Sequence, residues 1–111
     1  MKDLTHIVER FELFEERLGI TIEALFVGLD DKGDIHVNLE VHPRTGTGLQ
    51  RDIRIVVSLH DPAGRVTLLS SSDGMYKESF FGFKACSWKF YKDNDQIPSK
   101  LSKIRIYPQE R

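Results

Sequence analysis

The sequence lacks most features that would direct it to secretion or to a membrane. Its 111 residues include a single cysteine, Cys86, so no disulfide can form within the chain. Residues 1–19 carry acidic side chains and no continuous apolar core of a signal peptide. No apolar run reaches the ~18 positions that a membrane-spanning helix requires. We therefore expect a cytoplasmic protein with no membrane partner, folded as one domain over residues 1–111.

Motifs for catalysis and for cofactor binding are also missing. The Thr-Gly-Thr-Gly stretch at residues 45–48 lacks the Lys-Ser/Thr pair of a P-loop. The acidic turn at residues 30–34 has Ile35 and Val41 where a calcium-binding EF-hand loop needs glycine and glutamate. The serines at 70–72 lack the flanking glycines of a serine hydrolase nucleophile turn. The sequence predicts no enzyme activity and no cofactor.

Charge is distributed unevenly along the chain, although the net charge is only −1. Residues 1–40 hold four basic and ten acidic residues, whereas residues 41–111 hold twelve basic and seven acidic residues. A basic half could attract nucleic acid, but strands from both halves that interleave in one sheet would cancel these charges in space. We expect interleaved strands and no nucleic-acid partner.

The sequence is rich in apolar residues that alternate with polar ones, which is typical of strands with one buried face. The clearest case is Arg51–Ser70, where apolar residues alternate from position 53 to 59 and again at 66 and 68. Between them lies Asp61-Pro62-Ala63-Gly64. Pro62 suits the first central position of a type I turn, and Gly64 can adopt the positive φ at which the second strand begins. This segment predicts a β-hairpin.

The same alternation predicts strands through most of the remaining chain. We expect loops at residues 43–50, 70–78 and 93–99. A hairpin from Ile20 to Val41 is predicted around the turn Asp30–Asp34. A strand from Phe80 to Tyr91 is predicted with a bulge or a bend at Gly82, and a last strand from Lys103 to Tyr107 that Pro108 stops. With one strand near the N-terminus, the count is about seven. Short strands with frequent turn signals predict an all-β fold, namely an antiparallel immunoglobulin-like or fibronectin-III-like β-sandwich.

Residues 4–18 are compatible with two structures. Their apolar residues recur at helical spacing, with Asp3 as a possible N-cap and Gly19 beyond the end. Phe11 and Leu13, however, alternate as in a strand, and the remaining chain reads as strand throughout. The preferred interpretation is a strand over Glu9–Glu15, with the helix as the alternative.

The predicted hairpin also resembles a known family. The run Val57–Val66 is similar to the central hairpin of small bacterial immunoglobulin-like domains of the FxLYD type, with His60 where those domains have an aromatic residue. Residues Ser79–Phe83 and Ile104–Pro108 also resemble segments of such domains. The resemblance implies a β-sandwich over Ile20–Pro108, and it implies no catalytic residue.

A histidine-rich strand face is the best candidate for a metal site. His36, Asn38, Glu40 and His42 lie on one face of a predicted strand. At ~3.3 Å per residue the two histidines lie about 20 Å apart, whereas both ligands of one zinc ion must lie ~2 Å from it. Only Glu40 and His42 could share an ion, and a third ligand such as His60 or Asp61 would be needed. We interpret the face as a solvated polar surface and expect no metal.

The aromatic-rich segment at residues 80–91 offers two further candidates. Cys86 has no base identifiable from spacing, so we expect a buried thiol rather than a nucleophile. Lysines interleave with Trp88 and Tyr91, as in sheets that bind single-stranded nucleic acid. Alternation nevertheless places Trp88 on the same face as Cys86 and opposite Lys89, so Trp88 is predicted to lie in the core.

One hypothesis for function rests on Phe80, Phe81 and Phe83, which surround Gly82 and cannot all be buried by one sheet face. These residues predict an interaction surface for a protein partner or for self-association, in a non-catalytic interaction or assembly module. The alternative is a small-ligand or carbohydrate-binding domain that uses loops at one end of the sandwich, with Tyr76, His42 or His60 as contacts.

Overall fold

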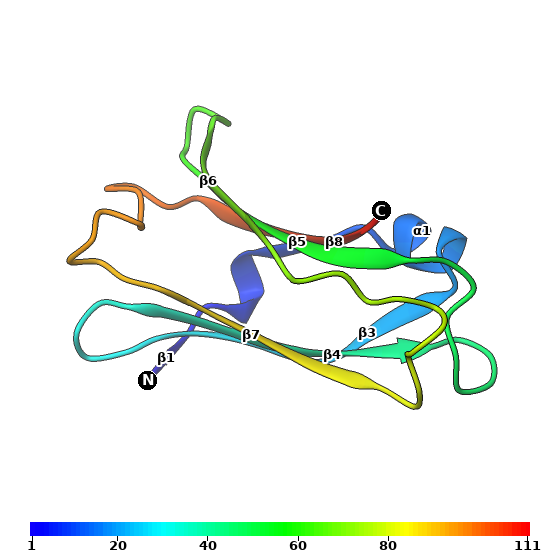
Figure 1. Cartoon of the computed structure of the whole chain (residues 1–111). Coiled ribbons are helices and arrows are strands. Elements are labelled where there is room, and N and C mark those ends of the chain that lie inside the picture. The colour runs from blue at the N-terminus through cyan, green and yellow to red at the C-terminus, as the bar shows by residue number, and fades with distance from the viewer.

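Two four-stranded β-sheets lie face to face in the computed structural model, which describes residues 1–111 (Figure 1). The first sheet has the strand order β1-β3-β4-β7 and the second has the order β2-β8-β5-β6. The elements are β1 (Lys2–Asp3), the 3-10 helix η1 (Thr5–Ile7), β2 (Val8–Arg10), α1 (Glu12–Arg17), β3 (Ile20–Leu29), β4 (Ile35–Pro43), β5 (Ile53–His60), β6 (Val66–Ser71), β7 (Lys84–Phe90) and β8 (Lys103–Glu110). The predicted all-β class is confirmed, with eight strands. None of the helical segments is long and apolar enough to cross a membrane.

Both predicted hairpins are confirmed, as β3–β4 and β5–β6. Asp30 closes the first turn, because its Oδ1 accepts hydrogen bonds from the N–H groups of Lys32 (2.9 Å) and Asp34 (3.0 Å). In the second turn, the Gly64 N–H donates to the Asp61 carbonyl (2.9 Å), and Gly64 has a φ of 84°. Both turns therefore follow from residue types that the sequence displays.

The core lies between the sheets and consists of the apolar residues at alternate strand positions. Its members are mainly isoleucine, valine and leucine, and 18 buried residues form one cluster. Cys86 is buried as predicted, and Trp88 is half-buried against the cluster. Such branched side chains contribute about 1.5–3 kcal/mol each when fully buried, so the core is a large contribution to the stability of the fold.

The strand predicted over Glu9–Glu15 is wrong for most of its length, because the chain forms β2 and then α1. One helical turn directs Glu15 inward, where its side chain is fully buried, while Leu13 remains 74% exposed. Phe11 also stacks on Phe14 at a centroid distance of 5.3 Å. A contact between residues i and i+3 is typical of a helical turn. The spacing of Phe11 and Phe14 therefore describes this segment better than the alternation of Phe11 and Leu13.

The antiparallel prediction also has one exception. β2 pairs with β8 in parallel, in the register Val8↔Ile104, whereas every other strand pair is antiparallel. β8 itself continues past Pro108, which was predicted to end it. Pro108 is tolerated there because β2 ends opposite Ile106, which leaves that side of β8 without a partner strand at Pro108.

The strand predicted from Phe80 begins only at Lys84, and β6 extends to Ser71, into a predicted loop. Gly82 has a φ of 81° and lies at a bend, which was one of the two predicted features, but the bend belongs to a loop and not to a strand. An actual bulge occurs in β3, where the register shifts between Glu23 and Phe26 and Ala24 has a φ of 52°.

Strands from the acidic and the basic halves of the chain are neighbours in both sheets, as predicted. β7 lies beside β4 in the first sheet, and β2 lies beside β8 in the second. Glu9 on β2 forms ion pairs with Lys103 (3.4 Å) and Arg105 (3.2 Å) on β8. The uneven charge of the sequence is therefore partly neutralised in the folded chain.

Candidate interaction surface

The two flanks of the sandwich differ in how their edge strands are covered. On one flank, which we call the strap flank, the segment β1-η1-β2 passes from the first sheet to the second and contributes an edge strand to each (Figure 1). On the other, the open flank, β6 and β7 are the edge strands and no strand pairs with their outer sides. The predicted aromatic surface lies next to this open flank.

The aromatic loop, which we define as residues Tyr76–Phe83, precedes β7. Phe81 is 80% exposed and Phe83 is 55% exposed. Phe80, by contrast, is half-buried and packs against the core cluster. Tyr76 is also exposed. Large apolar side chains that remain accessible together are a feature of interaction sites.

Backbone hydrogen bonds hold the aromatic loop at three places. Before it, Ile53 and Met75 exchange two backbone hydrogen bonds, of 2.9 and 2.7 Å. Within it, the Phe80 N–H donates to the Tyr76 carbonyl (2.9 Å), and near its end the Gly82 N–H donates to the Thr47 carbonyl (2.7 Å). The exposed rings therefore project from a backbone that the fold holds in place.

Phe83 extends the aromatic loop onto the outer face of the first sheet. Its ring stacks on His42, with a centroid distance of 5.2 Å and an interplanar angle of 6°. Nε2 of His42 lies 2.8 Å from a Glu40 carboxylate oxygen, and its Nδ1 lies 3.4 Å from a carboxylate oxygen of Glu23. The ring of His42 thus joins an aromatic surface to an acidic one.

The histidine-rich face behaves as a polar surface in the structure. Glu40 and His42 come together, whereas His36 lies 2.8 Å from Asp30, which belongs to the turn before β4. This contact with His36 is the main cause that lowers the pKa of Asp30 to about 2, helped by backbone N–H groups. No group of three or more histidine, cysteine or acidic side chains is arranged to hold a metal ion.

A shallow hollow of about 350 Å³ lies between the aromatic loop and the start of β7. Tyr76, Phe80, Phe81 and Phe83 all contribute to its walls. The hydroxyl of Tyr76 accepts a hydrogen bond from Nη1 of Arg111 (2.8 Å), and the guanidinium also lies 5.3 Å from the ring centroid. The walls of the hollow thus combine four aromatic rings with polar groups.

His60 does not join Tyr76 and His42, the other contacts suggested for a ligand. It is buried at the opposite end of β5, where its Nε2 lies 2.7 Å from the hydroxyl oxygen of Ser58. Burial lowers the pKa of His60, and the nearby cations of Arg105 and Lys103 lower it further. The pair has the residue types of a nucleophile and a base, but both side chains are buried and offer no access to a substrate.

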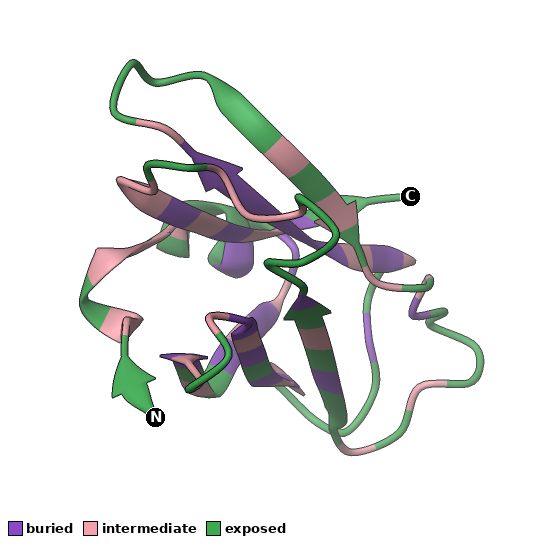
Figure 2. Ribbon diagram, turned by 90° about the vertical axis from the view of Figure 1, so that its left-hand side faces the viewer, coloured by how far each residue is buried: buried purple, intermediate pink, exposed green.

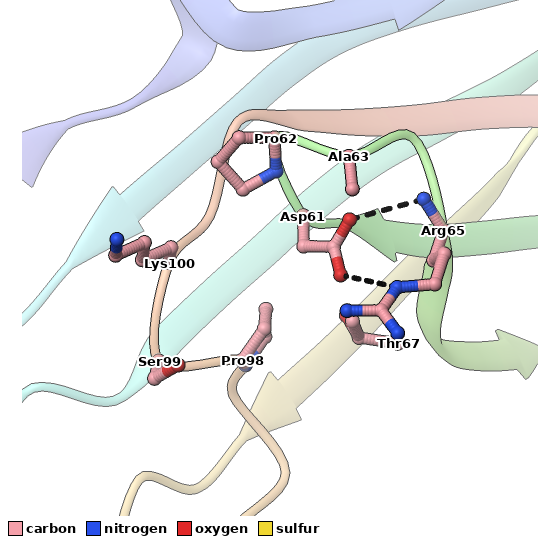
Figure 3. Close-up of a pocket in the computed structure, with 8 residues that line it drawn as sticks. All are labelled: Asp61, Pro62, Ala63, Arg65, Thr67, Pro98, Ser99 and Lys100. Carbon is pink, nitrogen blue, oxygen red and sulfur yellow. Dashed lines mark hydrogen bonds and ion pairs between the residues drawn. The ribbon is translucent and has the colours of Figure 1, made fainter.

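A second hollow, of about 460 Å³, lies at that opposite end, between the β5–β6 turn and the loop Pro98–Lys100 (Figure 3). Asp61 and Arg65 face each other across one wall, with an ion pair of 3.2 Å and a backbone hydrogen bond of 3.0 Å from Arg65 to Asp61 Oδ1. Lys100 points away from this pair (Figure 3). Asp61 and Arg65 thus pair with each other, and no other charged side chain of this hollow points toward them.

Sequence reasoning missed a buried ion pair on the strap flank. The fully buried carboxylate of Glu15 accepts hydrogen bonds from Arg10 at 2.7 and 3.1 Å and from the Ile22 N–H at 3.0 Å. Arg10 also donates to the Ile22 carbonyl (3.0 Å). The contact with Glu15 raises the pKa of Arg10. Glu15 stands among other acidic residues in the sequence, so no local pattern distinguishes it.

The thiol of Cys86 is buried in β7, and this burial raises its pKa. The thiol is therefore protonated at neutral pH, which suits a structural residue rather than a nucleophile.

The chain matches no protein-family model, no curated protein and no solved structure.

Proposed function

We propose that this chain is a non-catalytic interaction module, and that the aromatic loop together with the free edge of β7 binds an extended segment of a partner protein. The observation that supports this most directly is the exposure of Phe81 and Phe83 on a loop that backbone hydrogen bonds hold in place. An ordered aromatic surface binds with little loss of conformational entropy, which favours affinity.

The edge of β7 suits strand addition by such a segment. Ala85 and Ser87 are small and exposed, so their side chains leave the backbone of the edge accessible. An extended partner strand can form main-chain hydrogen bonds with an edge of this kind, while neighbouring side chains determine specificity. The aromatic loop is continuous with this edge and would supply that specificity.

Charge near the edge favours an acidic partner. Lys77, Lys84, Lys89 and Lys92 lie in or near the aromatic loop and β7, and all four are exposed. Only Lys89 has a carboxylate within reach, that of Asp34 at 4.0 Å. A partner segment that combines apolar residues with aspartate or glutamate would complement both the rings and the lysines.

Selection from a random peptide display library tests this proposal. Peptides enriched in apolar and acidic residues should bind the chain and should lose at least about tenfold in affinity with Phe81→Asp, since exposed aromatic residues often dominate binding. Leu13→Asp is the matched control, because Leu13 is 74% exposed on α1, which belongs to neither the aromatic loop nor β7. Fluorescence anisotropy gives the affinities. Failure to enrich any peptide, or equal binding by Phe81→Asp, would refute the proposal.

The second candidate function is binding of a small ligand or carbohydrate in the hollow beside the aromatic loop. The observation that favours it is the aromatic lining, with a volume of about 350 Å³. A panel of mono- and disaccharides, followed by thermal unfolding, provides the test. A stabilising shift that disappears with Tyr76→Ala would support this function over peptide binding.

We also propose that the sandwich has an immunoglobulin-like arrangement of strands. An immunoglobulin-like arrangement, as in the FxLYD-type domains that the Val57–Val66 hairpin resembles, is supported by the two packed sheets and by the confirmed β5–β6 pairing. The resemblance implies no chemistry, which agrees with a binding role.

A further inference from the structure

The four edge strands of the sandwich differ in how well they resist pairing with another chain. Natural proteins protect sheet edges by keeping them short or by placing charges on them. β1 has two residues and β2 has three, whereas β7 carries Lys84 and Lys89. β6 is six residues long, Val-Thr-Leu-Leu-Ser-Ser, and contains no charge and no proline. Its one protective feature is a register shift opposite Leu59 and His60, near its start.

The side chains of β6 are also unusually accessible for a strand. Leu69 is 61% exposed and Val66 is 55% exposed. Figure 2 shows the strand at the rim of the second sheet, without a fully buried residue. Leu69 lies opposite Ser58, on the outer face of that sheet. Exposed branched apolar residues on an uncharged edge favour association over solubility.

The backbone groups on the free side of β6 can be assigned from the pairing with β5. The Ser72 N–H donates to the Ile55 carbonyl (2.8 Å), so Ser72 faces β5. Because hydrogen-bonding direction alternates along an antiparallel strand, Ser70 and Leu68 also face β5, and Leu69 and Ser71 face the open side. Leu69 is therefore the central residue whose N–H and C=O are free to pair with another strand.

We propose that β6 pairs in antiparallel fashion with β6 of a second copy of this chain, across a two-fold axis at Leu69. In this register Leu69 of each copy lies opposite Leu69 of the other, and the free backbone groups of both are satisfied. The second sheets of the two copies then form one continuous sheet, and both exposed leucines meet on its outer face. A contact of this type is self-complementary, as two-fold symmetry requires.

Charge at the two ends of β6 supports this register. Arg65 precedes the strand and is exposed, with Asp61 as its partner at 3.2 Å across an exposed turn. Asp73 follows the strand, is exposed, and forms no ion pair within its own chain. Antiparallel pairing about Leu69 brings Arg65 of each copy close to Asp73 of the other. The edge thus has opposite charges at its two ends, as a homodimer needs.

This contact goes beyond the proposed function, because it uses neither the aromatic loop nor β7. The two surfaces lie on different sheets, so one chain could dimerise through β6 and still present its aromatic loop. Failure of one proposal therefore leaves the other intact.

Sedimentation equilibrium over a wide concentration range tests the dimer. The unmodified chain should reach twice its monomer mass, and Leu69→Lys should raise the dimer dissociation constant at least about tenfold, because it puts two like charges opposite each other. Leu13→Lys is the control on α1 and should leave the constant unchanged. A chain that stays monomeric throughout, or a dimer that Phe81→Asp weakens and Leu69→Lys does not, would overturn the proposal.

A charge exchange keeps the test decisive if Leu69→Lys fails to fold. Arg65→Asp alone should weaken the dimer, since it places an aspartate beside Asp73 of the other copy. Combining Arg65→Asp with Asp73→Arg should restore it. Hydrogen exchange adds a direct measurement, because the Leu69 and Ser71 amides should become protected as concentration rises. Weakening by the single variant without recovery in the double variant, or unprotected amides in the dimer, would contradict the register.

Discussion

The strap flank and the open flank of the sandwich differ in how many of their polar groups are paired within the chain. On the strap flank, the chain is fixed by a buried ion pair and by backbone contacts such as Leu4 N–H to Val27 carbonyl (2.8 Å). On the open flank, β6 and β7 leave one side of each strand unpaired, and large apolar side chains face solvent. Under the proposed function, the first flank contributes to stability and the second to binding. Substitutions should therefore separate the two properties.

The largest effect is expected from Glu15→Ala. It removes the carboxylate that accepts hydrogen bonds from Arg10 and from the buried Ile22 N–H. Arg10 is 30% exposed and keeps its bond to the Ile22 carbonyl, so the main loss is the unsatisfied Ile22 N–H, which costs about 1–3 kcal/mol. Urea denaturation measures the change in the free energy of unfolding. The control is Glu16→Ala, since Glu16 is exposed on the same helix. If both variants lost the same stability, the strap flank would not have the role assigned to it.

Acid should weaken the fold through His60, which lies in β5 beside the open edge strand β6. Its pKa in the folded chain is below the ordinary 6.5, so the unfolded chain binds a proton more readily. The free energy of unfolding should therefore be unaffected by this residue above about pH 6.5 and should fall as pH decreases below that value. Arg105, Lys103 and Glu9 are the charged groups that influence it.

Denaturation at several pH values, for the unmodified chain and for His60→Gln, measures this effect. The variant should lose the part of the pH dependence that sets in near pH 6.5. It should retain the contribution of Asp30, whose lowered pKa stabilises the fold above about pH 4, an effect lost as pH falls toward 2. An unchanged slope between pH 5 and 7 would show that His60 titrates alike in both states.

A smaller change is expected from Ala24→Gly at the bulge in β3. Ala24 has a φ of 52°, a backbone conformation that costs an alanine about 1 kcal/mol and a glycine almost nothing. The substitution should leave stability unchanged or raise it by up to about 1 kcal/mol. Ala85→Gly in β7 has no positive φ to relieve and should lower stability by about 0.5–1 kcal/mol. Equal losses in both variants would argue against strain at the bulge.

The smallest effect on stability should come from Phe81→Asp on the aromatic loop. Phe81 is 80% exposed, and surface substitutions of this kind usually change stability by less than about 0.5 kcal/mol. Thermal unfolding of the variant, beside the peptide-binding measurement, shows whether binding and stability separate. A large loss of stability would mean that the ring supports the loop rather than a partner.

The sequence predicted the parts of the fold that depend on local patterns. Alternation identified the strands from Ile20 onward, and the turns at Asp30–Gly33 and Asp61–Gly64 followed from residue types with defined backbone preferences. The start of β7 was less predictable. Aromatic residues favour strands, so Phe80–Phe83 resembled one, although the positive φ of Gly82 directs the chain into a loop.

Other features depend on contacts between distant residues and could not be read locally. The parallel pairing of Val8 with Ile104 joins the two ends of the chain, and no local pattern specifies it. Burial of Glu15 depends on Arg10 and on the backbone of Ile22, which only the tertiary structure brings together. The sequence predicted that Phe80, Phe81 and Phe83 cannot all be buried, without indicating which would be exposed, and the structure exposes Phe81 and Phe83 on a loop in place of the expected strand.

The placement of β8 has a consequence for how this chain folds during its synthesis. β8 is made after the other three strands of its sheet, yet it is an inner strand, with β2 on one side and β5 on the other. While a ribosome is still adding residues 103–110, β2 has no neighbour in its sheet and the isoleucines of β5 lack their cover from Ile104 and Ile106. The second sheet therefore cannot be completed until residues 103–110 have been made, and during that interval apolar strand surface is accessible to chaperones.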